Sequence, residues 1–120
     1  MITCGIDMIE VHRIDDAILR HGDRFFDRFY TPQELIDSTG RTTALAARFA
    51  AKEAAAKALG SGIGEVSWKE IEIVKGKSGA PQLKLHGKAQ ALAHQRGWRE
   101  WSVSLSHTHE HAIAMVVAND

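Results

Sequence analysis

Three side chains could together bind a divalent cation and a phosphorylated ligand: Asp7, Glu53 and Lys57. Asp7 follows Gly5 and Ile6 near the N-terminus, and Glu53 and Lys57 lie in an alanine-rich segment in the middle of the chain. Magnesium is commonly held by one or two carboxylates, with water and substrate phosphate completing its octahedron. A lysine beside them is then free to contact phosphate oxygens. The residue types therefore suggest metal-assisted chemistry on a phosphorylated substrate.

Each of these residues also has an ordinary structural interpretation. Glu53 and Lys57 are four residues apart, the spacing of a helix-surface ion pair that contributes about 0.2–0.5 kcal/mol. Asp7 at the end of a strand could cap a following helix. Against a merely solvated helix, nine of the sixteen residues from Ala44 to Leu59 are alanine, which allows a partner to approach closely. The residues alone leave both interpretations open.

The histidines and the glycine-rich loop carry weaker signals. His107, His109 and His111 alternate, a conceivable zinc or nickel site, but three ligands on one short turn rarely converge on a metal. We favour His107, at a strand end, as a donor to phosphate or a nucleotide. The loop Gly60–Gly64 follows a helix C-terminus and lacks Gly-Lys-Ser/Thr, so it is not a P-loop. It is either a flexible connection or part of a ligand channel.

Charge is unevenly distributed along a chain whose net charge is zero. Residues 1–40 contain four arginines and eight carboxylates, whereas residues 41–120 contain eleven basic and seven acidic residues. An anionic ligand should therefore favour the second part. In the first part, Arg13, Arg20 and Arg24 could face an acidic partner helix, although on composition alone the aspartates between them favour local salt bridges. The basic excess is too diffuse for a nucleic-acid arm.

Length and composition predict one globular domain spanning residues 1–120, in which 44% of the residues are hydrophobic. No apolar run reaches the roughly 20 residues that a membrane span requires. The single cysteine, Cys4, rules out an internal disulfide and fits a reducing compartment. The N-terminus has no basic leader. We expect a cytoplasmic protein without a membrane partner.

The elements that must position these residues follow from hydrophobic periodicity and from turn and cap signals. Ile2 to Met8 alternates as a half-buried strand, with Asp7 opposite its apolar set. The order indicates an α+β fold whose later strands form an antiparallel sheet. The other expected elements are helices at Val11–His21, around Phe25–Phe29, from Pro32, at about Thr43–Leu59 and at Gly87–Arg96, and strands at Val66–Val74, Gln82–Leu85, Trp101–Leu105 and Ala112–Ala118.

Five segments, in order and at matching separations, resemble the bacterial holo-acyl-carrier-protein synthases, which are short 4′-phosphopantetheinyl transferases. The resemblance covers nearly all 120 residues. The segments are Gly5-Ile6-Asp7 with Glu10 and Arg13-Ile14, Phe29-Tyr30-Thr31-Pro32-Gln33-Glu34, the run from Arg48 to Gly60 with its Lys-Glu-Ala-x-x-Lys helix, Gly79-Ala80-Pro81, and Ser104-Leu105-Ser106-His107-Thr108.

The resemblance implies a reaction and a fold. The family transfers the 4′-phosphopantetheine arm of coenzyme A to a serine of apo-acyl carrier protein and releases adenosine 3′,5′-bisphosphate, with Mg²⁺ at the pyrophosphate. This supports fatty acid biosynthesis. The implied fold is a mostly antiparallel sheet packed against the long alanine-rich helix. Members of this kind form homotrimers with active sites shared between subunits, which suits the doubly apolar last strand.

The resemblance also assigns roles to individual residues. Asp7 and Glu53 would be the metal ligands, and Lys57 would contact the phosphates. Either Glu53 or a metal-bound water would take the serine proton. The coenzyme A site would be lined by Lys57, Gly60, Pro81, Ser106 and His107, and the carrier protein would face Arg13, Arg20 and Arg24. A rival hypothesis is a trimeric binding module without catalysis, but such a module has no need of both carboxylates.

Overall fold

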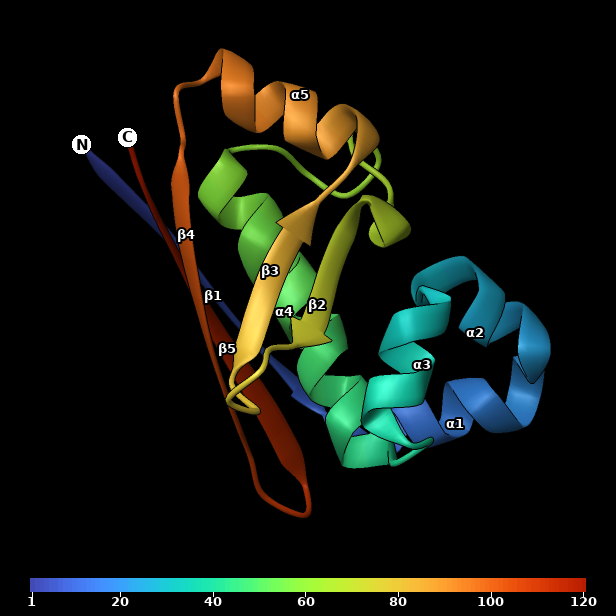
Figure 1. Cartoon of the computed structure of the whole chain (residues 1–120). Coiled ribbons are helices and arrows are strands. Elements are labelled where there is room, and N and C mark those ends of the chain that lie inside the picture. The colour runs from blue at the N-terminus through green and yellow to red at the C-terminus, as the bar shows by residue number, and fades with distance from the viewer.

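Two antiparallel sheets and five α-helices make up the fold, and the computed structural model describes all 120 residues (Figure 1). In chain order the elements are β1 (Ile2–Glu10), α1 (Val11–His21), α2 (Asp23–Phe29), α3 (Pro32–Ser38), α4 (Thr42–Leu59), a 3₁₀ turn (Trp68–Glu70), β2 (Ile71–Lys75), β3 (Pro81–Leu85), α5 (Gly87–Gln95), β4 (Glu100–His107) and β5 (His111–Asn119). None of the helices combines the length and the apolar composition needed to cross a bilayer.

The larger sheet has the order β1-β5-β4, so the two ends of the chain lie side by side. Helix α4 runs across one face of this sheet, and β2 and β3 form a separate hairpin (Figure 1). Every strand pair is antiparallel, which confirms the expected α+β class. The buried side chains of β5 are small, which lets the helix lie close to the strand: Ala112, Ala114, Val116 and Ala118.

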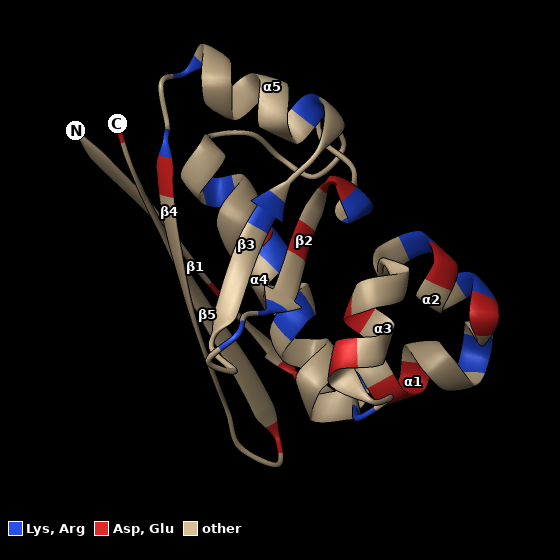
Figure 2. Cartoon of the chain, in the orientation of Figure 1, with Lys and Arg blue, Asp and Glu red and all other residues tan.

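The alternation predicted for β1 is present, but its faces are the reverse of a half-buried strand. Gly5 is buried and Asp7 half-buried beneath α4, whereas Ile2, Ile6 and Met8 are 70%, 55% and 61% exposed. With the half-exposed Met115 of β5, they form an outward apolar face. Along most of their length, β1, β4 and β5 carry no charged residue (Figure 2). An uncharged apolar sheet face of this kind is typical of an interface.

Close approach of α4 to β1 explains the glycine at position 5. A Cβ atom built on Gly5 would overlap the main-chain oxygen of Ala54 and lie 2.9 Å from the nitrogen of Ala58. Ala54 and Ala58 are themselves buried, and neither has a side chain long enough to hold the strand away. The backbones of β1 and α4 therefore meet directly, and this contact determines how far Asp7 lies from the helix.

A buried ion pair fixes the opposite side of α4. Lys52 and Glu34 are fully buried, and Lys52 Nζ lies 2.7 Å from Glu34 Oε1. The same ammonium donates to the carbonyls of Trp68 and Ile71 at 3.0 and 2.7 Å. All three of its donors are therefore used. Glu34 also completes the predicted capping box of α3 with Thr31.

The strand expected at Val66–Val74 is shorter than predicted. Ser67 and Glu70 form a second capping box, so the chain makes one 3₁₀ turn before β2 begins at Ile71. The local hydrogen bonds of that cap compete with extended structure, which periodicity alone does not reveal. Ile71 and Ile73 point inward as expected and are fully buried.

Candidate active site

Asp7 and Lys57 are paired where β1 passes under the second half of α4, and Glu53 lies near enough for the charges of both to act on it. Lys57 Nζ lies 3.1 Å from Asp7 Oδ1 and donates to the carbonyl of Ile6 at 2.9 Å. Lys57 therefore pairs with Asp7 on the neighbouring strand and not with Glu53 on its own helix. The ion pair that helical spacing suggested for Glu53 and Lys57 is absent from the salt bridges of the structure.

The surroundings of Glu53 disfavour its charged form. The pKa of Glu53 is raised, first because burial disfavours its charged form and second because Asp7 is negative, while Lys57 acts in the opposite direction. Two like charges held together by the backbone fold favour a cation between them. Glu53 also gains proton affinity, which brings its pKa closer to neutral pH.

Gly60 ends α4 in the left-handed conformation, with φ of 80°. The site predicted for coenzyme A thus begins at a turn that favours glycine. Arg96, which follows α5, covers this turn: its Nη1 lies 2.7 Å from the position of a Cβ atom on Gly60. Lys57 and Gly60 lie three residues apart at the C-terminal end of α4.

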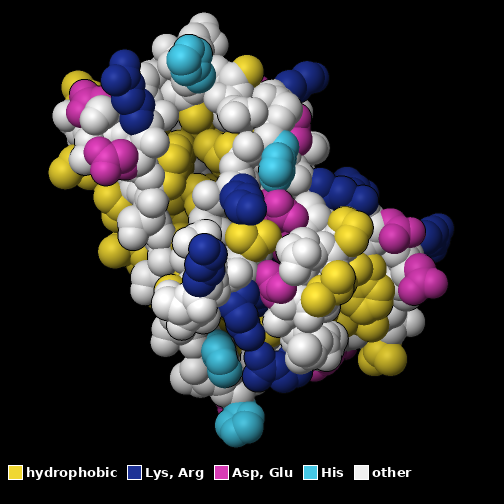
Figure 3. All heavy atoms as spheres, in the orientation of Figure 1, with side chains coloured by type: hydrophobic (Ala, Val, Ile, Leu, Met, Phe, Trp, Pro, Cys, Tyr) yellow, Lys and Arg dark blue, Asp and Glu magenta, His cyan; other side chains and the backbone are white.

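Pro81 and His107 lie in a different place, at a pocket of about 180 Å³ near the start of α4. Its lining also contains the cations Arg41, Arg48 and Lys75, with one acid, Asp37. Basic side chains and a histidine gather on this face, beside the ends of β2 and β3 (Figure 3). The pocket has the charge expected of a phosphate-binding site.

Ser106, His109 and His111 lie outside the pocket that contains Pro81 and His107. Ser106 is exposed on β4, opposite Ile113, and does not line the pocket that contains its neighbour His107. The turn between β4 and β5 places His107 and His111 at its two ends. No cluster of three or more His, Cys, Asp or Glu side chains is arranged to hold a metal ion.

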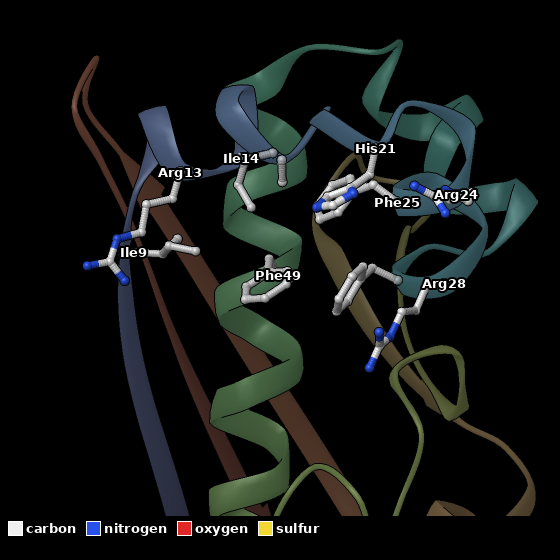
Figure 4. Close-up of a pocket in the computed structure, with 10 residues that line it drawn as sticks. Ile9, Arg13, Ile14, His21, Arg24, Phe25, Arg28 and Phe49 are labelled. Carbon is white, nitrogen blue, oxygen red and sulfur yellow. The ribbon is translucent and has the colours of Figure 1, made fainter. Parts of the chain in front are cut away.

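Two of the three predicted carrier-binding arginines line one groove. Arg13 of α1 and Arg24 of α2 border a cavity of about 660 Å³ whose apolar wall includes Phe49 of α4 (Figure 4). Arg20 is exposed on α1 but does not line it. Arg28 does line it, one helical turn after Arg24. The groove thus combines an apolar floor with a basic rim.

Several residues of these sites carry little or no signal in the sequence. Arg28 follows Arg24 by four residues, the spacing of one helix face, but the aspartates around it favour local salt bridges. Arg41 and Arg48 are seven residues apart and therefore share one face of a helix. Nothing in the sequence indicates that Lys75 and Arg96 belong to these sites, because only folding brings the end of β2 and the residue after α5 to α4.

Comparison with known proteins gives the context of this site. The profile of the 4′-phosphopantetheinyl transferase superfamily matches residues 3–116. The chain belongs to this family. It is 49% identical over 124 residues to the holo-[acyl-carrier-protein] synthase of Herpetosiphon aurantiacus, covering 98% of each chain. The expected enzyme class, a phosphopantetheinyl transferase, is confirmed by this match.

Solved structures of such transferases have the same fold. The holo-[acyl-carrier-protein] synthase of Neisseria meningitidis superposes with a TM-score of 0.90 at 35% identity, with full coverage of both chains. The enzyme of Helicobacter pylori, solved in complex with coenzyme A, gives 0.89 at 33% identity over 97% of this chain and 99% of its own. The phosphopantetheinyl transferase fold therefore extends over the whole chain.

Proposed function

We propose that the protein transfers 4′-phosphopantetheine from coenzyme A to a serine of apo-acyl carrier protein, in the cytoplasm and as a step that supports fatty acid biosynthesis. The observation that carries the proposal is the Asp7–Glu53 carboxylate pair beside Lys57, in a chain whose relatives are holo-[acyl-carrier-protein] synthases. One domain, residues 1–120, holds all the residues involved.

The carboxylate pair fits Mg²⁺. Asp7 and Glu53 offer hard oxygen ligands, and the pKa of Glu53 is raised by burial and by the charge of Asp7, so a cation would relieve their repulsion. Two protein carboxylates, with the other positions left to water and phosphate, suit magnesium better than zinc. When bound, Mg²⁺ would neutralise charge that builds on the pyrophosphate as the leaving group departs.

The chain's own groups supply the remaining chemistry. The serine hydroxyl forms a bond to the β-phosphorus of coenzyme A, and the bond from that phosphorus to the oxygen bridging to the α-phosphate breaks. Adenosine 3′,5′-bisphosphate leaves with that oxygen. The serine proton passes either to Glu53, the protein carboxylate beside Asp7, or to a water on the metal. Lys57 uses two donors on Ile6 and Asp7, which leaves the third for a phosphate.

The groove bordered by Arg13, Arg24 and Arg28 would receive the carrier protein. Its basic rim complements an acidic helix, and its apolar wall, which includes Phe49, can bury that helix's apolar side chains. Arg20, exposed outside the groove, would meet the carrier only at its periphery.

A homotrimer would complete the coenzyme A site. Lys57 and Gly60 lie at the end of α4, whereas Pro81 and His107 lie near its start. One copy would provide the phosphate end and its neighbour the pocket containing Pro81 and His107. The outward face formed by Ile2, Ile6, Met8 and Met115 offers the apolar contact such a trimer needs. Ser106, exposed on the same sheet, would reach the site across this interface.

Mixing two inactive variants tests the shared site. Asp7→Asn and His107→Ala copies, unfolded together and refolded as mixed trimers, should recover part of the transfer activity. Each variant refolded alone should stay inactive. Absence of recovery in trimers shown to contain both copies would contradict a site shared between subunits.

The transfer itself is tested by mass spectrometry. Apo-acyl carrier protein, coenzyme A and Mg²⁺ are incubated with the protein, and the carrier is weighed. We expect a phosphopantetheine mass gain that chelation of Mg²⁺ abolishes. Asp7→Asn should prevent it, whereas the control Glu65→Gln, on an exposed loop residue, should not. Tight coenzyme A binding with no mass gain on any carrier would instead support a binding module.

A further inference from the structure

Arg96 lies against the end of α4, outside the residues assigned so far. Its side chain is exposed, and Nη1 donates to the main-chain oxygen of Leu59. The same nitrogen covers Gly60, whose φ of 80° and lack of a side chain make room for it. The guanidinium therefore occupies the point where the helix ends and the expected coenzyme A site begins.

A helix leaves its last four carbonyls without partners inside the helix. In α4 each of the four has one: Ala56 accepts from Ser61 N at 3.0 Å, Lys57 from Gly60 N at 3.0 Å, Ala58 from Thr3 Oγ1 at 2.9 Å, and Leu59 from Arg96. Only the partner of Leu59 carries a charge. The end of this helix is thus fully bonded, and Arg96 is its single charged cap.

The charge matters because a helix C-terminus is electrically unfavourable for phosphate. Aligned peptide dipoles place roughly half a negative charge there. Lys57 and Gly60, the residues expected to meet the phosphates of coenzyme A, both lie on this last turn. An anionic ligand approaching them is repelled unless positive charge offsets the dipole.

We propose that Arg96 is a positioning residue for coenzyme A, which holds the Lys57–Gly60 turn and offsets the negative end of α4 so that phosphate can bind there. The proposal rests on the proposed function. Arg96 acts through the turn and through its charge, and takes no part in bond making or breaking. Its contribution therefore belongs to coenzyme A binding and not to the chemical step.

Three substitutions separate the charge from the hydrogen bond. Arg96→Leu removes both, Arg96→Gln keeps a donor without charge, and Arg96→Lys keeps the charge. At saturating carrier and Mg²⁺, we expect Arg96→Leu and Arg96→Gln to raise KM for coenzyme A about 3- to 10-fold with kcat within about twofold. Arg96→Lys should restore most of the affinity. The differences should shrink at high salt, because the side chain is exposed.

Two control variants test whether any lost hydrogen bond near the end of α4, or any lost positive charge, would raise KM in the same way. Thr3→Val removes the neighbouring bond to Ala58 without changing charge. Arg99→Leu removes one positive charge at another exposed arginine, three residues further along the chain. Both should keep KM for coenzyme A within about twofold of the original protein. An unchanged KM in Arg96→Leu, an equal rise in either control, or a fall in kcat alone would overturn the proposal.

Failure of the proposed function gives a different result. If the original protein transfers no phosphopantetheine, the function is wrong, and calorimetric binding of coenzyme A to the original protein and to Arg96→Leu still tests the role of Arg96. Equal affinities there would overturn the inference. If transfer occurs and KM does not respond to Arg96, only the inference fails.

Discussion

Lys57 on α4 bonds to Asp7 on β1 at 3.1 Å, although Glu53 lies one turn away on its own helix. The lysine thus links the strand to the helix and counters the charge of one carboxylate, while the second remains beside it without a bonded cation. We therefore expect the protonation of Glu53 to depend on whether a cation binds beside Asp7.

Glu53→Gln should lose transfer activity by about 100-fold or more, because it removes a metal ligand and a proton acceptor together. The folded state should be as stable as the original or more so, since a charge repelled by Asp7 is gone. Activity is measured by the carrier mass shift and stability by thermal melting. Full activity would remove Glu53 from the site.

Stability of the metal-free protein should respond to pH through the same residue. Unfolded Glu53 loses its proton near the ordinary pKa of 4.5, whereas folded Glu53 loses it at higher pH. Between these values the native state binds more protons, so the free energy of unfolding falls as pH rises. Urea unfolding with chelator, compared between the original protein and Glu53→Gln, isolates this slope. Identical pH slopes in the two proteins would contradict the raised pKa.

Gly5→Ala should destabilise the protein by about 1–3 kcal/mol, because the new methyl group meets the backbone of α4. Transfer should fall as well, since the shift separates Asp7 from Glu53. The matched control is Gly62→Ala, where a Cβ atom would meet nothing within 4 Å. Urea unfolding measures the stability of both variants. Equal stabilities of the two variants would refute the close strand–helix contact.

Lys52→Met should cost about 3–5 kcal/mol, because Glu34 would keep its charge in a fully buried position without a cation. The double variant Glu34→Leu with Lys52→Met should recover part of this loss, since it leaves no charge unpaired. Chemical denaturation measures both variants. A double variant less stable than Lys52→Met would contradict an unpaired charge as the cause.

Met8→Lys should convert the proposed trimer to monomers and reduce transfer, because a charge enters the outward apolar face of β1. Ile36→Lys is the control, since Ile36 is 67% exposed on α3, away from that sheet. Sedimentation velocity reports the assembly. A trimer that persists unchanged in Met8→Lys would exclude this face as the interface.

Most of the elements and the class of the fold could be predicted from the sequence, because caps and periodicity act locally. Thr31 with Glu34 marked the start of α3, and Gly60 the end of α4. The buried face of β1 could not be predicted from caps and periodicity. Apolar residues are expected inside, but Gly5 faces the helix because only it fits there, and Ile6 and Met8 face outward.

The site was predictable only in part for a similar reason. Asp7, Glu53 and Lys57 stood out through residue type and through family resemblance. The partners of those residues depend on contacts between distant segments. Arg96 meets Leu59 across 37 residues, and Lys57 meets Asp7 across 50, so no local spacing could identify the pairs.

Glu34 joins local and long-range structure through one carboxylate. Its Oε1 accepts from Thr31 N, which starts α3, and from Lys52 of α4, while Oε2 accepts from Ile73 N of β2 at 2.9 Å. The first turn of α3 therefore cannot fray without loosening the other two elements. Amide hydrogens of these three segments should exchange through the same opening event, as a single cooperative unit of unfolding.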